Sequence, residues 1–257
     1  MITIKKPNEF EKMAIAGATV AVVLRTVREA AAPGVTMKEL DAVAADVIRS
    51  RGCTPSFLGY HGFPAHICTS PNSVIVHGIP DTYRLKDGDI LSVDAGAIYE
   101  GFHGDAAITF AIGDIDPAVQ RLLETTEASL WSGIQEVKDG ARLGDIGSAV
   151  QAGADRQGFG VVREYVGHGI GRQMHEEPQV PNFGKKGTGM KLRTGMAICI
   201  EPMFNLGGAE TRVEADGWTV VTADGTLSAH FEHTIGITED GPIVFTADDL
   251  SSGSNDD

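Results

Sequence analysis

Apolar residues recur at helical spacing in four stretches of the chain, and the stretches form two consecutive pairs. Two stretches open on a residue typical of a helix N-terminus with a glutamate three residues later, Asn8 with Glu11 and Thr36 with Glu39. The third stretch is preceded by Asp116 and starts with a proline. We therefore expect four helices, which begin at Asn8, Thr36, Asp116 and Leu143.

Short runs rich in β-branched residues follow each helix pair. They cover residues 90–93, 107–112 and 197–200. Such runs are typical of buried strands. The pattern predicts an α/β or α+β chain.

The sequence also contains an internal repeat that places acidic residues at matching positions. The segment LKDGDILSVD ends at Asp94, and it aligns with LRTGMAICIE, which ends at Glu201. The segment HGD, ending at Asp105, aligns in the same way with HFE, ending at Glu232. These matches indicate a duplicated unit of two helices and strands. The alternative is two similar units that match by chance.

The matched carboxylates are candidates for metal binding. A carboxylate near the middle of a sheet is costly unless it is paired or bound to a metal, and four together would repel strongly. A pair of divalent cations would remove that cost, and the imidazole of His168 would complete a site that suits Mn, Fe, Co or Zn. Two metals can share an activated water, so the indicated reaction is metal-assisted hydrolysis. Taken singly, each carboxylate could instead be a solvated residue at a strand end.

Composition limits the choice of partners and location. The net charge of -14 repels phosphate backbones and anionic lipid, so nucleic acid and membrane surfaces are poor partners, whereas a free amino terminus is a suitable one. No apolar run reaches the roughly 18 to 20 residues needed to cross a bilayer, and the start of the chain lacks a secretory signal. Three scattered cysteines do not make a disulfide framework. We expect a cytoplasmic protein with reduced thiols.

Length and composition favour one catalytic domain over residues 1–245. The repeat divides it into halves at about 8–113 and 116–245. Residues 246–257, TADDLSSGSNDD, are acidic, serine-rich and without periodicity, so we expect a disordered tail.

Several motifs carry a resemblance to a known family over nearly the whole chain. They are NSVIVHGIP at 72–80, VDAG at 93–96, GFHGDAAITF at 101–110, GHGIGRQMHEEPQVPNFG at 167–184, IEPMF at 200–204 and FEHTIGIT at 231–238. Together these motifs resemble type I methionine aminopeptidases. The resemblance implies an α+β pita-bread fold, in which two pseudo-symmetric halves form a curved antiparallel sheet backed by two helix pairs.

Matched motif by motif, the resemblance implies two divalent metal ions and a bridging hydroxide that attacks the carbonyl after the first substrate residue. The implied metal ligands are Asp94, Asp105, His168, Glu201 and Glu232, with Asp105 and Glu232 bridging. Glu201 is similar to the family's general base, His175 to the residue that stabilises the oxyanion, and His77 to the histidine that contacts the scissile amide. The implied substrate is the N-terminal methionine of nascent polypeptides, followed by a small second residue.

By position, the resemblance also nominates a pocket for the methionine side chain. Its residues are Phe57, Tyr60, Phe63, Cys68, Met174 and Trp218, with His77 and His175 at the edge. Core packing explains any one of these apolar residues equally well. The chain departs from the family at Phe57, where many bacterial members have cysteine, at Met174, where an aromatic residue is frequent, and at Gly96, where threonine is common. These departures concern the shape of the pocket and leave the metal ligands intact.

The remaining histidines and two other protein classes complete the comparison. His61 is expected on the pocket wall or just behind it, and His66 and His233 are expected to be ordinary imidazoles.

A prolidase or X-Pro aminopeptidase has a similar metal set but usually carries an extra amino-terminal domain, whereas here the first helix is expected near Asn8. A binding protein without catalysis predicts missing ligands, yet all five are present. We expect a monomer, with transient ribosome contact left open.

Overall fold

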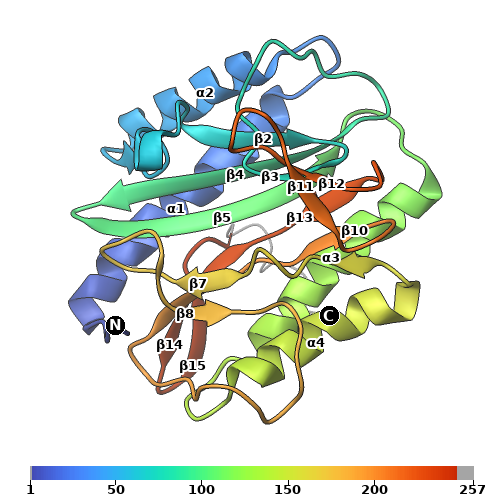
Figure 1. Cartoon of the computed structure of the whole chain (residues 1–257). Coiled ribbons are helices and arrows are strands. Elements are labelled where there is room, and N and C mark those ends of the chain that lie inside the picture. The colour runs from blue at the N-terminus through green and yellow to red at the C-terminus, as the bar shows by residue number, and fades with distance from the viewer. Residues whose placement is uncertain (1, 248–257) are drawn as a thin grey trace, which may run out of the picture.

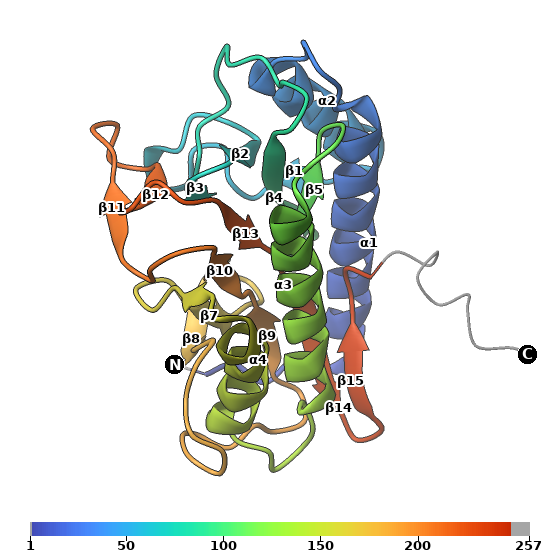
Figure 2. The ribbon, with the colours of Figure 1, turned by 90° about the vertical axis from the view of Figure 1, so that its right-hand side faces the viewer.

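The helices form two packed pairs, and the strands lie between and beside them (Figure 1). The structure is a computed structural model and describes residues 2–247. Its α-helices are α1 (Pro7–Ala30), α2 (Met37–Ser50), α3 (Pro117–Gln135) and α4 (Leu143–Gln157). Helix α1 packs on α2, and α3 packs on α4. Figure 2 shows α1 and α3 on one side of the strands, with β11 and β12 projecting from the other.

Local capping interactions explain where the helices begin. The hydroxyl of Thr36 accepts a hydrogen bond from the backbone N–H of Glu39, and the Glu39 carboxylate accepts one from Thr36, which confirms the predicted cap of α2. The predicted cap of α1 was wrong, because the helix begins at Pro7 and is capped by Lys6 rather than by Asn8. Proline suits this first position, since its missing N–H would have no partner within the helix.

All strand pairs described here are antiparallel, and they form four sheets. The first contains β1 (Thr54–Pro55), β2 (Ile67–Pro71), β4 (Ile90–Tyr99) and β5 (Phe102–Ala111). The second contains β6 (Gly160–Val161), β10 (Met203–Asn205) and β13 (Ser228–His230), and the third contains β3 (Val74–Val76), β11 (Thr211–Val213) and β12 (Val220–Thr222). The fourth contains β7 (Gly167–Gly169), β8 (Glu176–Val180), β9 (Ala197–Ile200), β14 (His233–Thr238) and β15 (Gly241–Val244). The curved sheet implied by the resemblance is built from these parts, with the short helix η1 (Tyr60–Gly62) at its side.

Two threonine side chains join the halves of the molecule. The hydroxyl of Thr234 donates to the carbonyl of Asp105 (2.7 Å) and accepts from its N–H (2.9 Å). Thr109 makes the same pair of bonds with the backbone of His230 (2.7 and 2.8 Å). We call these four bonds the threonine clasp. Between them, the backbone of β5 bridges that of Glu232, so the clasp fixes the two acidic segments of the repeat against each other.

The chain remains packed beyond the last strand. Thr246, the first residue of the expected tail, is buried, and its hydroxyl accepts a hydrogen bond from the N–H of Thr234. The folded part therefore extends at least to this residue, and positions 248–257 lie outside the described residues. Within residues 2–247, no helix is long and apolar enough to span a membrane.

Alanine at Gly17 should destabilise the protein, because α1 meets its neighbours there without room for a side chain. A Cβ atom at Gly17 would lie 2.3 Å from the carbonyl oxygen of Phe245, and one at Gly104 would lie 2.7 Å from the Gly17 nitrogen. We expect Gly17→Ala to lower the free energy of unfolding by about 1–3 kcal/mol in chemical denaturation. Ala18→Ser on the exposed face of the same helix is the control and should change it by no more than about 0.5 kcal/mol. An unchanged Gly17→Ala midpoint would contradict this packing.

Candidate active site

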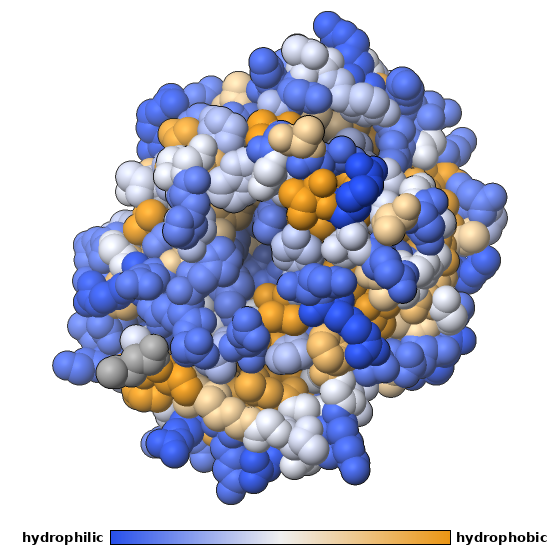
Figure 3. Space-filling view, viewed as in Figure 1, coloured by the Kyte–Doolittle hydropathy of each residue, from blue (hydrophilic) through white to orange (hydrophobic). Residues whose placement is uncertain are grey.

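One cavity of about 280 Å³ gathers every site residue that the sequence nominated. Its lining comprises Phe57, Tyr60, His61, Phe63, Cys68, His77, Asp94, Asp105, His168, Met174, His175, Glu201, Trp218 and Glu232. The molecular face shown in Figure 3 is mostly hydrophilic, with apolar side chains confined to small patches. The lining of the cavity thus brings together acidic, imidazole and apolar side chains from residues that lie far apart in the sequence.

The hairpin of β4 and β5 supplies the first carboxylate pair. Asp94 lies opposite Ala107 in the ladder, and Asp105 lies two residues from Ala107 on the same strand. Because alternate residues of a strand point to the same face, the two carboxylates are diagonal neighbours on one face of the hairpin. Asp105 is 2% exposed, so neither water nor a surface cation compensates its charge.

The matching pair in the second half lies where β9 ends and β14 begins. Glu201 follows β9 directly, and Glu232 precedes β14, which pairs antiparallel with β9. The two glutamates are therefore brought together at the same end of this strand pair. The bridge between β5 and Glu232 then places them beside the Asp94–Asp105 pair, which realises the arrangement that the repeat predicted.

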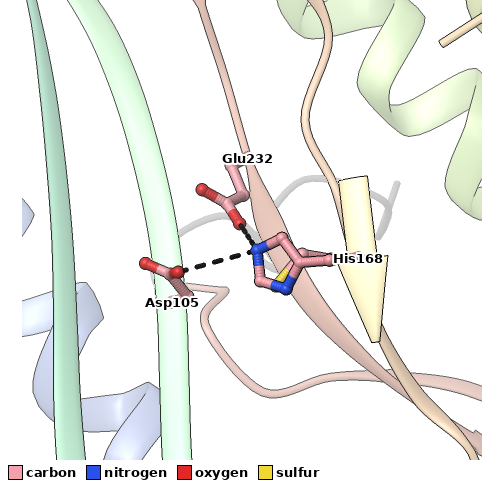
Figure 4. A group of neighbouring side chains, drawn as sticks. Asp105, His168 and Glu232 are labelled. Atoms are coloured by element: carbon pink, nitrogen blue, oxygen red, sulfur yellow. Dashed lines mark ion pairs between the residues drawn. The ribbon is translucent and has the colours of Figure 1, made fainter. Parts of the chain in front are cut away.

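His168 on β7 points into this group of carboxylates (Figure 4). Its Nδ1 lies 2.9 Å from the carbonyl oxygen of Gly169 and donates to it, which leaves Nε2 without a proton in the neutral ring. The Nε2 atom lies 3.5 Å from Glu201 Oε1 and 3.9 Å from both Asp105 Oδ2 and Glu232 Oε1. A nitrogen lone pair and several carboxylate oxygens thus converge without touching, as donors around a cation would.

Burial perturbs the ionisation of the whole group. It raises the pKa of Asp94 to about 7 and raises those of Asp105, Glu201 and Glu232 well above their ordinary values, with neighbouring carboxylates adding to the effect in the last three. Burial also lowers the pKa of His168 to about 3, so its ring is neutral at physiological pH. Perturbed groups of this kind, clustered in a cavity, are typical of a functional site.

Unsatisfied oxygens show that this group is suited to a metal. Asp94 Oδ1, Asp105 Oδ1 and Glu232 Oε1 are buried and have no hydrogen-bond partner among residues 2–247. Leaving buried carboxylate oxygens unpaired is costly, and divalent cations would satisfy them. A donor set of carboxylates and one imidazole is of the type that Mn, Fe, Co or Zn accepts. The residues present therefore fit the implied metal centre.

The other side of the cavity is apolar. Phe57, Phe63, Cys68 and Met174 are buried together there. The rings of Phe57 and Phe63 meet edge to face at 6.4 Å, and Phe63 meets Trp218 at 5.2 Å. Phe57 and Met174, the two departures from the family in this part, both contribute to the wall. The result is an apolar recess that opens directly beside the carboxylates.

His77 and His175 lie between the acidic and apolar sides. His77 has a left-handed backbone (φ 61°), an uncommon conformation that is often found at functional sites, and burial lowers its pKa to about 4. His175 Nδ1 is hydrogen-bonded to the hydroxyl of Tyr60 at 2.8 Å, and its ring lies 4.2 Å from that of His168. Both imidazoles line the cavity together with the carboxylates, and the hydrogen bond to Tyr60 orients that of His175.

Two further residues contact the carboxylates and were not nominated from the sequence. His230 is 2% exposed, and its Nε2 lies 3.7 Å from Glu201 Oε2. The thiol of Cys199 belongs to a group of potential metal donors with Asp105, His168 and Glu232. A signal was present, because each lies two residues before a nominated glutamate and so shares its side of an extended chain.

The other histidines agree with the expectations for them. His61 lies on the cavity wall, against the ring of Tyr60. His66 is bonded to Asp41, and His233 is bonded to Thr246, both outside the cavity.

Comparison with known proteins gives the family. The family model described as metallopeptidase family M24 matches residues 11–239. The chain belongs to metallopeptidase family M24. This M24 metallopeptidase is 48% identical to the methionine aminopeptidase of Clostridium perfringens over 246 residues, which is 96% of this chain and 99% of that protein. It is equally identical to methionine aminopeptidase 1 of Bacillus subtilis, with the same coverage.

Solved structures confirm the pita-bread fold of the M24 metallopeptidase. The crystal structure of methionine aminopeptidase from Thermotoga maritima matches with a TM-score of 0.95 and 45% identity, covering 96% of this chain and all of that one. Prolidase from Pyrococcus furiosus matches with a TM-score of 0.77 at 21% identity, which shows a shared fold alone. This chain covers 66% of that prolidase.

Neutralising Asp94 should stabilise the metal-free metallopeptidase at alkaline pH. Burial raises the pKa of Asp94 from 3.8 to about 7, so the folded state binds this proton more tightly than the unfolded state does. Stability is therefore lost as pH rises through this window, and Asp94→Asn removes that loss. In chelator, the variant should melt at a higher temperature than wild type at pH 8, with a smaller difference at pH 5.

Added metal should reverse the order at pH 8, because asparagine is a poorer ligand than a carboxylate. Asp46→Asn is the control, since Asp46 is exposed on α2 and should shift the melting temperature equally little at both pH values. If Asp94→Asn destabilised the metal-free protein equally at both pH values, this would contradict the raised pKa assigned to Asp94.

Proposed function

We propose that this metallopeptidase removes the N-terminal methionine from newly made polypeptides, with a preference for a small second residue. The observation that carries the proposal is the shared cavity, in which two carboxylate pairs lie directly beside an apolar recess. The names of the relatives support the same substrate, and the small second residue follows from the family resemblance. We propose that residues 1–245 act as one catalytic domain.

The proposed metal centre would hold two divalent ions. Its ligands would be Asp94, Asp105, His168, Glu201 and Glu232. When bound, such ions supply a Lewis acid for the substrate carbonyl and activate water at neutral pH. The identity of the ions is proposed to be Co, Mn, Fe or Zn, in keeping with the mixed oxygen and nitrogen donors.

The side chains around this centre have separate proposed roles. The acidic cavity attracts the positively charged amino terminus of the substrate. Glu201, which lies between His168 and His230, would take a proton from the attacking water and pass it to the leaving nitrogen. His77 and His175 border the path of the peptide and would hydrogen-bond the scissile amide and the developing oxyanion, respectively.

The apolar recess would take the methionine side chain. A flexible thioether packs well against aromatic rings, and Phe57, Phe63 and Trp218 present such rings. The hydroxyl of Tyr60 would hold His175 in place through their hydrogen bond. Phe57 and Met174 both line the recess, and we propose a close fit to an unbranched side chain.

The substrate also suggests where the protein acts. Newly made polypeptides carry their first methionine in the cytoplasm, so we propose that the enzyme acts there. We also propose that it works as a monomer. Contact with the ribosome is proposed to be transient.

Peptide cleavage tests the proposed reaction. We expect the protein, stripped of metal and resupplied with Mn²⁺ or Co²⁺, to release methionine from a Met-Ala peptide and to leave an Ala-Pro peptide intact. Asp105→Ala and Glu232→Ala should abolish the release, because each removes a proposed ligand, while Asp46→Ala should not affect it. Cleavage of Ala-Pro alone would assign the chain to prolidase chemistry, and no cleavage with any metal would favour a binding role.

Replacing His77 should slow turnover more than it weakens substrate binding. If His77 contacts the scissile amide as the reaction proceeds, His77→Ala should lower kcat about 100- to 1,000-fold with a smaller change in KM. Steady-state kinetics on the Met-Ala peptide measure both. His66→Gln, outside the cavity, is the matched control with wild-type kinetics expected. A His77→Ala change confined to KM would instead place this residue in ground-state binding.

A further inference from the structure

His230 is held rigidly beside the acidic centre, although the proposed function gives it no role. It is the last residue of β13, and both of its backbone groups are bound by Thr109 in the threonine clasp. Its side chain is 2% exposed. The backbone therefore has little freedom to move this imidazole away from Glu201.

The ring nitrogen that faces the centre lacks a partner. Nε2 of His230 is buried and has no hydrogen bond to any of residues 2–247. Glu201 Oε2 lies 3.7 Å from it, which is too long for a hydrogen bond. A buried nitrogen without a partner is costly, so either a proton donor, a proton acceptor or a cation is expected to meet it.

The neighbouring groups favour a cation. Donor atoms of Glu201, His230 and Glu232 all lie within 4.8 Å of one another. His168 faces Glu201 through its other carboxylate oxygen, Oε1, so the two imidazoles approach this carboxylate from its two oxygens. A separation of 3.5–3.9 Å between such donors leaves space for an ion between them.

We propose that His230 is a metal ligand, which binds together with Glu201 and Glu232 and gives the centre a second imidazole besides that of His168. The inference rests on the metal centre of the proposed function and adds a ligand to it. A second nitrogen donor shifts the preference of the site towards Co, Zn and Fe and away from Mg and Ca. Direct hydrogen bonding from His230 to Glu201 is the competing role.

Metal binding to purified, metal-free protein separates these roles. Co²⁺ is titrated calorimetrically into wild type, His230→Gln, His233→Gln and Asp105→Ala, and X-ray absorption at the cobalt edge then reports imidazole ligation. Glutamine can still donate a hydrogen bond to Glu201 but does not replace an imidazole ligand. His233 is the matched control, because it lies three residues away with its Nδ1 bonded to Thr246.

We expect His230→Gln to weaken binding of one of the two Co²⁺ ions by at least about 100-fold, the upper end of the loss from removing an outer hydrogen-bond partner. The imidazole signal per protein should fall by half, and His233→Gln should match wild type in both measurements. Wild-type ligation and affinity in His230→Gln would overturn the inference and leave the metal centre standing. Asp105→Ala lacks a proposed ligand and serves as the reference for lost Co²⁺ binding. If the wild-type protein bound Co²⁺ no better than this variant, the proposed function itself would be overturned.

Discussion

The structure depends on compensating four carboxylates that are removed from water within one cavity. Transfer of an ionised carboxylate into a protein interior is costly, and mutual repulsion adds to the cost. The fold does not relieve this with lysine or arginine: the carboxylates face imidazoles and a thiol. The raised pKa of each acid reflects the same free-energy cost of ionisation. Stability and chemistry are thus linked, because cations that offset this cost would also activate water for hydrolysis.

A rigid backbone holds the four carboxylates in place despite their mutual repulsion. Asp94 and Asp105 lie on a long, regular hairpin, and Glu201 and Glu232 lie at the ends of paired strands. The threonine clasp then fixes the two pairs relative to each other, with each hydroxyl used as both donor and acceptor. Catalytic centres gain from such support, since ligands held by regular elements cannot drift apart when their charges repel.

The sequence revealed features that depend on local chemistry or on repetition. The caps of α2 and α3 follow from Thr36 and Asp116, whose side chains bond the next few backbone groups. The carboxylates were found because duplication placed them at matching positions of the repeat, although Asp94 and Asp105 lie within their strands and only Glu201 and Glu232 lie at strand ends. The division into four sheets and the packing of Thr246 could not be predicted, because they depend on contacts between distant segments. His230 was within the aligned repeat, yet its importance emerges only when its unpaired nitrogen is seen to be buried.

The clasp also sets the order in which this protein can mature on the ribosome. Its bonds join residues 129 and 121 positions apart, so they form only when the last strands have been synthesised. A nascent chain that ends before Glu232 lacks one of the four carboxylates that complete the cavity. Pairing across such distances is slow compared with local folding. Chains that stop short of the last strands therefore lack both the complete set of carboxylates and the bonds that hold the two halves together.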